Sequence, residues 1–229
     1  MRHPAFGVLL CMLPALLSCT AAGPGGPTGP QSEPTAGAPP MSAAQLLELS
    51  ATGDTARGEM AFEVCQGCHR RGGAGRPNGS YPRLAGQHAS VLVKQLHDIQ
   101  VGRRTNHKML PFADESVLGP QQMADVAAYL QAQPPGIDNG KGPGRDLDLG
   151  RSVYAGSCAR CHGERGQGDA AQFFPRLAGQ HYLYLLREVK AIRDGQRGNS
   201  SPEMIDILRG HSETELDAAC DYASRLALD

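Results

Sequence analysis

The chain contains Cys65-Gln66-Gly67-Cys68-His69 and, further on, Cys158-Ala159-Arg160-Cys161-His162. Both segments have the form C-x-x-C-H, the motif at which a c-type haem is attached. Two thiols spaced in this way on one turn of helix can add to the two vinyl groups of a haem, and the adjacent imidazole then coordinates the iron. We therefore predict two covalently bound haems c. The predicted attachment residues are Cys65, Cys68, Cys158 and Cys161, and the predicted proximal ligands are His69 and His162.

The two motifs belong to a longer internal repeat with an offset of 93 residues. The segment Pro82-Arg83-Leu84-Ala85-Gly86-Gln87-His88 reappears unchanged as Pro175-Arg176-Leu177-Ala178-Gly179-Gln180-His181. Seven identical residues in register with the cysteines indicate one duplicated domain. At roughly 80 to 90 residues, each half has only a marginal apolar core, and a covalently held haem would stabilise it.

The spacing of apolar residues predicts helices and shows no β pattern. In each half we expect one helix before the cysteines, one in the middle and one at the end. Asp54 or Thr55 is expected to cap the first helix, and Ser212 with Glu215 forms an S-x-x-E capping box for the last. Gly58 with Phe62, and Gly150 with Tyr154, share the i, i+4 spacing of one helix face. Their distances to the first cysteine differ by one residue, which leaves open whether the two helices superpose.

The N-terminus predicts an exported protein. A short positive start precedes an apolar run over residues 5–17, which is too short for a membrane span of about 20 residues and fits a signal peptide over 1–18. The run ends in Leu16-Leu17-Ser18-Cys19, which resembles a bacterial lipobox, so we expect Cys19 to carry lipid and anchor a periplasmic protein to the membrane. The alternative is cleavage after Ala22, which would leave a soluble periplasmic protein.

Composition divides the rest of the chain. Residues 19–41 are rich in Gly and Pro and predict a disordered tether. We place a first domain at 42–133, a linker at 134–146 and a second domain at 147–229. With 22 Lys and Arg against 23 Asp and Glu, the chain lacks the basic excess that nucleic-acid binding requires.

In its motifs, their order and their duplication, the chain resembles the diheme class I cytochromes c of the cytochrome c4 family, over roughly residues 50–229. The resemblance implies an all-α fold of two tandem class I cytochrome c domains, packed face to face, each a few helices around a covalent haem. It also implies a periplasmic or membrane-tethered electron carrier without chemistry of its own.

A class I haem takes His on one face of the iron and usually Met on the other. Met204 is the one methionine of the second half and lies 46 residues after Cys158, and Met109 lies 44 residues after Cys65. We expect Met109 and Met204 to be the distal ligands. Met123 competes in the first half, but its place on an apolar helix stripe favours core packing.

The remaining histidines have other predicted roles. His107 lies close enough to Met109 to offer an alternative, bis-His coordination. His88 and His181 stand at the start of a helix, where hydrogen bonding or exposure is expected rather than ligation. We expect His97 and His211 to face solvent.

Two repeated residues follow each proximal histidine. Pro82 and Pro175 lie 13 residues after it, and in class I cytochromes a proline carbonyl at about this distance accepts the Nδ1–H of the ligand. Arg83 and Arg176 are expected to pair with haem propionates. The alternative for both arginines is a solvated surface charge.

Cys220 remains outside these assignments. Thiosulfate dehydrogenases resemble this architecture but replace a Met ligand by Cys, so a spare cysteine is a candidate ligand. Its position in the middle of a helix favours core packing instead.

The predicted function is that of a periplasmic diheme electron-transfer protein, which shuttles electrons between a respiratory donor and a terminal oxidase or reductase. Its partners are then redox proteins. The alternative is a diheme oxidoreductase, such as a thiosulfate dehydrogenase or the cytochrome subunit of a periplasmic dehydrogenase, which requires an open or labile coordination site. A zinc module is a third class, but its C-x-x-C pairs normally stand about 15 to 20 residues apart, far closer than here. The sequence favours the carrier and leaves the question of catalysis open.

Overall fold

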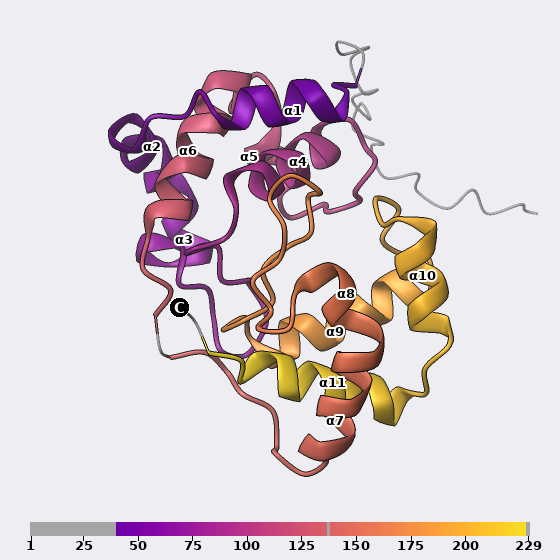
Figure 1. The fold of residues 1–229 in the computed structure, drawn as a ribbon. Helices are drawn as coiled ribbons and strands as arrows, with labels where there is room; N and C mark the ends of the chain where they lie inside the picture. Colours follow the sequence, from indigo (N-terminus) through magenta and orange to yellow (C-terminus); the bar gives the residue numbers. More distant parts are fainter. Residues whose placement is uncertain (1–39, 137, 228–229) are drawn as a thin grey trace, which may run out of the picture. The chain divides into compact units, whose positions relative to one another are not determined.

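The computed structural model describes residues 40–136 and 138–227, and within these ranges every regular element is a helix (Figure 1). Asp169 and Phe174 form an isolated antiparallel bridge. The expected all-α class is confirmed. The predicted signal peptide, Cys19 and nearly all of the tether lie outside the described residues. None of the helices in the described ranges has the length and apolar character needed to cross a bilayer.

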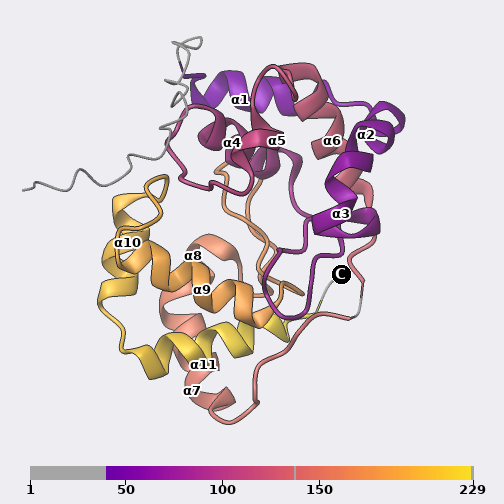
Figure 2. The same ribbon diagram turned by 180° about the vertical axis from the view of Figure 1, so that it is seen from behind.

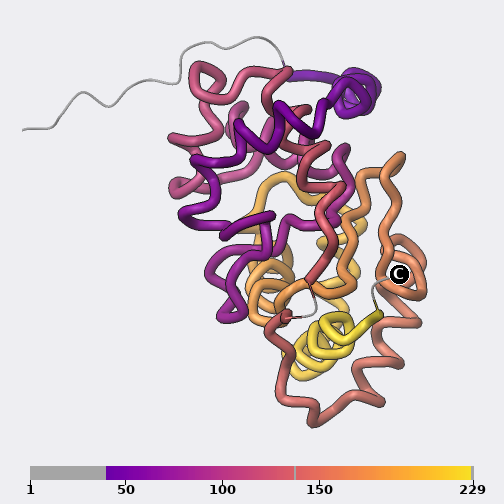
Figure 3. Tube along the Cα trace, turned by 90° about the vertical axis from the view of Figure 1, so that its left-hand side faces the viewer, coloured from indigo at the N-terminus to yellow at the C-terminus, as the bar shows by residue number. Residues whose placement is uncertain are grey.

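The two repeats share one order of elements, to which the first repeat adds α1 and η2. The first consists of α1 (Ala43–Ser50), α2 (Thr55–Phe62), the 3-10 turn η1 (Glu63–Cys65), α3 (Gln66–His69), the 3-10 turn η2 (Arg71–Gly73), α4 (Ala89–Gln100), α5 (Leu110–Ala113) and α6 (Pro120–Ala132). The second consists of α7 (Leu147–Val153), the π turn η3 (Tyr154–Cys158), α8 (Ala159–His162), α9 (Tyr182–Arg193), α10 (Pro202–Arg209) and α11 (Glu213–Ser224). Figure 3 shows the chain passing from one repeat to the other through the segment after α6.

Helix α1 was not expected. It begins with a capping box, in which Ser42 Oγ accepts from Gln45 N–H at 3.3 Å and Gln45 Oε1 accepts from Ser42 N–H at 2.9 Å. Leu46 is buried against α4 and α6. The S-x-x-Q signature from Ser42 to Gln45 was visible in the sequence, directly after the assigned tether, which ended at Met41.

Each repeat is built on a close helix crossing at a glycine. A Cβ on Gly58 would lie 2.0 Å from the carbonyl oxygen of Asp125 in α6, and one on Gly150 would lie 2.2 Å from that of Ala218 in α11. Asp125 and Ala218 are themselves 93 residues apart, so the two crossings are equivalent. Figure 2 shows α7 lying against α11. Only glycine allows the backbones to approach so closely.

The spacing from the crossing glycine to the first cysteine differs by one residue between the repeats, and the turn before the motif accommodates this difference. Gly58 precedes the first cysteine of its motif by seven residues, and Gly150 precedes its own by eight. The first repeat crosses this segment in the 3-10 turn η1 and the second in the π turn η3. Because a π turn accommodates more residues than a 3-10 turn, the glycine crossing and the C-x-x-C-H helix are both kept.

Aromatic side chains fill the space beside each crossing. Phe62 packs against Tyr129 with ring centroids 5.6 Å apart, and Tyr154 packs against Tyr222 at the same distance. Met123 is fully buried in the first core, as expected. These two cores frame the space between the cysteine motifs and the middle helices α4 and α9.

The described part of the linker is bound to the second repeat. Asn139 Nδ2 donates to the carbonyl oxygens of Gln180 and Ser224, at 3.1 and 2.6 Å. Tyr182 N–H donates to Gly140 O at 2.7 Å. The limits of the two domains stay a prediction.

Candidate functional site

A cavity of about 1300 Å³ contains the residues of both motifs. Its lining includes all twelve residues that the sequence assigned to the haems and their surroundings: Cys65, Cys68, His69, Pro82, Arg83, Met109, Cys158, Cys161, His162, Pro175, Arg176 and Met204. Leu92, Leu96, Leu185 and Val189 add apolar side chains from α4 and α9. The structure thus brings together residues that are up to 139 positions apart in the chain.

Both motif histidines are held by a proline carbonyl. His69 Nδ1–H donates to Pro82 O at 3.3 Å, and His162 Nδ1–H donates to Pro175 O at 2.9 Å. Burial lowers the pKa of both imidazoles, against the opposite effect of the carbonyl bond. The rings are therefore neutral, and Nε2 carries a free lone pair. This is the form of histidine that binds a metal.

The residues present fit a covalently attached haem in each repeat. His69 Nε2 is buried and has no partner among the described residues. Leaving such an atom unpaired costs about 1–3 kcal/mol, so a ligand that occupies it stabilises the fold. The cysteines of each motif flank one helical turn and are half-buried at the cavity. Burial raises the pKa of Cys65, and that of Cys158 to about 11, so these thiols are protonated when free.

Both candidate distal methionines lie at the start of a helix. Met109 precedes α5, and its N–H donates to Asn106 Oδ1 at 3.3 Å. Met204 lies in the first turn of α10, where its N–H donates to the cap Ser201 Oγ at 3.2 Å. Pro202 explains the helix, because proline favours the first helical position.

The repeated heptapeptides bind each other across the two halves. Gln180 Oε1 accepts from Arg83 N–H and Gln180 Nε2 donates to Arg83 O, both at 2.9 Å. Gln87 Oε1 accepts from Arg176 N–H at 2.9 Å, and Gln87 Nε2 donates to Arg176 O at 3.1 Å. The four bonds form two equivalent pairs, so the halves are related by a local twofold arrangement at this point.

Neither arginine is a solvated surface charge. Arg83 is 4% exposed, and its Nη1 donates to the carbonyl oxygens of Gly136 and Gly179 at 2.5 and 2.8 Å. Burial lowers the pKa of Arg83. Arg176 is half-buried, and the Nε atoms of both arginines are buried without a partner in the described part of the chain. Both side chains line the large cavity.

The repeated histidines also bridge the halves, as hydrogen-bonding residues. His181 is fully buried, with Nε2 donating to Ala74 O at 3.0 Å and Nδ1 accepting from Gly140 N–H at 3.1 Å. His88 Nε2–H donates to Gln167 O at 2.7 Å. Ala74 and Gln167 are again 93 residues apart.

The expectation that His97 faces solvent is wrong. It is 4% exposed, and its Nε2 accepts from Met41 N–H at 3.0 Å. The unexpected segment leading into α1 covers it. His211 is also turned inward in part, with Nε2 at 2.9 Å from Ser157 Oγ. His107 is exposed and lies at the cavity.

Cys220 lies in the second core. It is buried among Tyr154, Leu185 and Ala223, next to Cys158, and burial raises its pKa far above that of a free thiol. Core packing therefore describes its surroundings, although the thiol also borders the cavity.

Sequence reasoning missed the partners that join the repeats. It singled out the heptapeptides but assigned no role to their glutamines. It also passed over Gln95, Glu188, Arg104 and Arg197, which form a second set of bonds between the halves. Their signal was the same 93-residue offset, which relates Gln95 to Glu188 and Arg104 to Arg197.

This fold and site define a c-type cytochrome with two haem-binding repeats. The cytochrome c family model matches the chain twice, over residues 55–134 and 147–212. Cytochrome c4 from Pseudomonas aeruginosa is 35% identical over 161 residues, which cover 68% of this chain and 79% of the relative. A thiosulfate dehydrogenase electron acceptor from Stutzerimonas stutzeri is 32% identical, over 80% of this chain and 92% of the relative.

Solved structures agree with these relatives. Reduced cytochrome c4 from Pseudomonas stutzeri superposes with a TM-score of 0.69 at 28% identity, covering 76% of this chain and all of the other. A thiosulfate dehydrogenase from Marichromatium purpuratum gives 0.62 at 32% identity, over 80% of this chain and 40% of the other. The chain belongs to the diheme cytochrome c4 family. It is an electron-transfer protein with two covalently bound haems c as its cofactors.

Proposed function

We propose that both haem irons are six-coordinate, with His69 and Met109 as axial ligands in the first repeat and His162 and Met204 in the second. Cys65 and Cys68, and Cys158 and Cys161, form the thioether bonds. A haem held in this way supplies a one-electron iron couple of raised potential. The protein then acts as a carrier, because a filled coordination sphere leaves no position for a substrate.

The observation that carries this proposal is the buried, unpartnered Nε2 of His69. Its ring is fixed by the Pro82 carbonyl, and His69 lines the same cavity as Met109. The hydrogen bond to the proline carbonyl fixes which imidazole nitrogen carries the proton and raises the basicity of the other nitrogen. His162 and Pro175 repeat the arrangement.

Arg83 and Arg176 are proposed to pair with the propionates. Both arginines line the cavity, and each has a buried Nε–H that lacks a partner in the described residues. A charged donor that is buried without an acceptor is costly, and a carboxylate would satisfy both its charge and its hydrogen bond. The halves bind each other through the backbone of these same arginines.

We place the carrier in the periplasm, between a dehydrogenase or quinol-oxidising donor and a terminal oxidase or reductase. The signal peptide and the lipobox at Cys19 support this location and a lipid anchor. Two relatives are named as electron acceptors of thiosulfate dehydrogenase, which supports a periplasmic dehydrogenase as donor. Replacing Cys19 with Ser should release the protein from the membrane fraction, and a variant that stays bound would refute the anchor.

Spectra of the holoprotein test the ligand set. A pyridine haemochrome assay should count two haems per chain, and the oxidised protein should show the weak long-wavelength methionine-to-iron band. Met109→His and Met204→His should each remove about half of this band and lower the potential of one haem. Met123→Leu, a change in the first core, should leave the band intact.

An oxidoreductase would give a different result. A high-spin haem, or CO binding to one haem of the reduced wild type, would show an open or labile coordination site and favour the enzyme. Retention of the whole band in Met204→His or in Met109→His would overturn that residue's assignment.

A further inference from the structure

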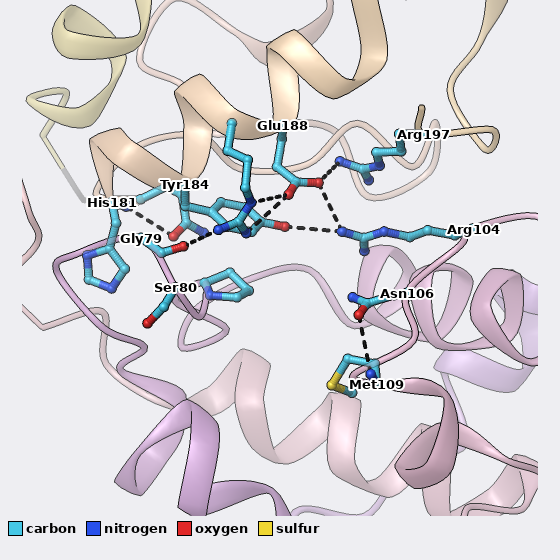
Figure 4. A network of polar contacts seen from close by, with 12 residues as sticks. Gly79, Ser80, Arg104, Asn106, Met109, His181, Tyr184, Glu188 and Arg197 are labelled. Carbon is cyan, nitrogen blue, oxygen red and sulfur yellow. Dashed lines mark hydrogen bonds and ion pairs between the residues drawn. The ribbon is translucent and has the colours of Figure 1, made fainter. Parts of the chain in front are cut away.

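A second network joins the repeats beside the two methionine segments. It consists of Gln95 in α4 and its equivalent Glu188 in α9, together with the equivalent arginines Arg104 and Arg197. All four side chains line the large cavity. Figure 4 shows Arg104 and Arg197 converging on Glu188, with Asn106 and Met109 on the Arg104 side.

Arg104 binds the middle helix of both repeats. Its Nη1 donates to Gln95 Oε1 at 2.9 Å within its own repeat. Its Nη2 donates to Glu188 Oε2 at 3.1 Å and to the Tyr184 hydroxyl at 3.3 Å, both in the other repeat. The segment that leads to Met109 is therefore fastened to α9.

Arg197 makes the equivalent contacts from the second repeat. Its Nη1 donates to Glu188 Oε2 at 2.9 Å within its own repeat, and its Nη2 donates to Gln95 Oε1 at 2.9 Å in the other. Asn199 Nδ2 adds a bond to Gln95 Oε1 at 3.0 Å. The segment that leads to Met204 is fastened to α4 in the same way.

Burial gives these contacts their strength. The side chains of Arg104, Glu188 and Arg197 are 13%, 15% and 18% exposed, so solvent screens the ion pairs weakly. Arg104 and Arg197 share Glu188 Oε2, since the first repeat offers the neutral Gln95 where the second offers Glu188. Arg187 donates to the other oxygen, Glu188 Oε1, at 3.2 Å. Loss of the Glu188 charge would thus affect Arg104 and Arg197 together.

Each arginine stands shortly before a methionine and is connected to it by a fixed turn. Arg104 precedes Met109 by five residues; Arg104 N–H donates to Asp98 O at 2.8 Å, and Asn106 holds Met109 N–H. Arg197 precedes Met204 by seven residues, and its Nε donates to Asn199 Oδ1 at 3.1 Å before Ser201 caps α10.

We propose that Arg104 and Arg197 are positioning residues, each of which holds the distal-methionine segment of its own repeat against the middle helix of the other. Coordination of each haem then depends on the opposite repeat, and Glu188 serves both sites. The inference rests on the proposed ligands Met109 and Met204.

The test uses holoprotein and follows the NMR signal of each ligand methionine methyl group. Met109→His and Met204→His assign the two signals. In Arg104→Leu, the ratio of detached to bound Met109 should rise about tenfold, the effect of losing one charged hydrogen bond, while the Met204 signal is retained. Arg197→Leu should do the reverse, and Glu188→Gln should weaken both signals.

Conservative and matched variants separate positioning from general stability. Arg104→Lys keeps the charge and should restore part of the Met109 signal. Lys190→Leu and Glu213→Gln remove an ion pair of the second repeat whose side chains are 39% and 66% exposed, and should change neither signal. Equal weakening of both signals in Arg104→Leu, or no change in Arg104→Leu and Glu188→Gln, would overturn the inference. A wild type that lacks the two methionine signals would instead overturn the proposed ligands.

Discussion

Gln87 and Gln180 are equivalent residues of the two repeats, and each makes two hydrogen bonds to the backbone of the arginine that stands four residues before the other. The identity of the two heptapeptides thus has a structural counterpart, since each copy is bound by the other. Arg83 and Arg176 are held by these same bonds at the haem cavity. One segment therefore joins the repeats and places an arginine of each at the large cavity.

Replacing Gln180 with Ala should lower the free energy of unfolding by about 2 kcal/mol. The change leaves the N–H and C=O of Arg83 unpaired inside the protein. Urea unfolding of the holoprotein measures the effect, and the exposed Gln172→Ala serves as the control. An unchanged midpoint in Gln180→Ala would show that water replaces both bonds.

The glycine crossings should not tolerate a methyl group. Gly58→Ala and Gly150→Ala each place Cβ within about 2 Å of a backbone oxygen of the facing helix, and we expect a loss of about 3 kcal/mol in each case. Gly67→Ala is the control, because a Cβ at this helical position meets no atom within 4 Å. Thermal unfolding of the three variants tests the ranking, and equal midpoints for all three would contradict it.

Asp125 should make stability fall in acid. Hydrogen bonds from Arg57 lower the pKa of this buried carboxyl to about 2, below its ordinary value of 3.8. A depressed pKa stabilises the folded state above the unfolded value, and this contribution is lost as the pH falls from about 4 towards 2. Unfolding of Asp125→Asn should show a shallower pH dependence in that window, whereas the exposed Glu164→Gln should keep the wild-type slope. A wild-type slope in Asp125→Asn would refute the assignment.

Cys220→Ala should leave both haem spectra unchanged and cost about 1 kcal/mol of stability. The thiol packs among Tyr154, Leu185 and Ala223, so its removal creates a small cavity. Visible spectra and thermal unfolding of the same sample separate the two effects. Loss of a ligand band in Cys220→Ala would mean that this sulfur, and not that of Met204, reaches iron.

Local patterns selected residues that the fold brings together, and their roles at the haems stay predictions. The C-x-x-C-H motifs, the proline 13 residues later and the single methionine of the second half all appear along one cavity. Each of these signals depends on a few residues on one turn or on a fixed spacing, and such relationships survive without knowledge of the fold. The capping boxes at Ser42 and Ser212 belong to the same kind. The first of them was overlooked, although it stands at the start of the assigned first domain.

The burial of individual side chains was predicted less well. His97 was expected at the surface, but the segment before α1 covers it, and Arg83 is buried where a solvated charge was an open alternative. The burial of a side chain depends on which distant parts of the chain pack against it. For Arg83 this is Gln180, 97 positions further along the chain.

By itself, the sequence determined the two C-x-x-C-H motifs, the number of haems and the duplication of the domain, because each of these is written in adjacent or regularly spaced residues. Only the tertiary structure decided that the two copies bind each other through their glutamines, and that Arg104 and Arg197 each contact both middle helices. Those contacts depend on how one repeat faces the other. No spacing along the chain specifies that orientation. It is selected by packing and by the exclusion of water from paired charges.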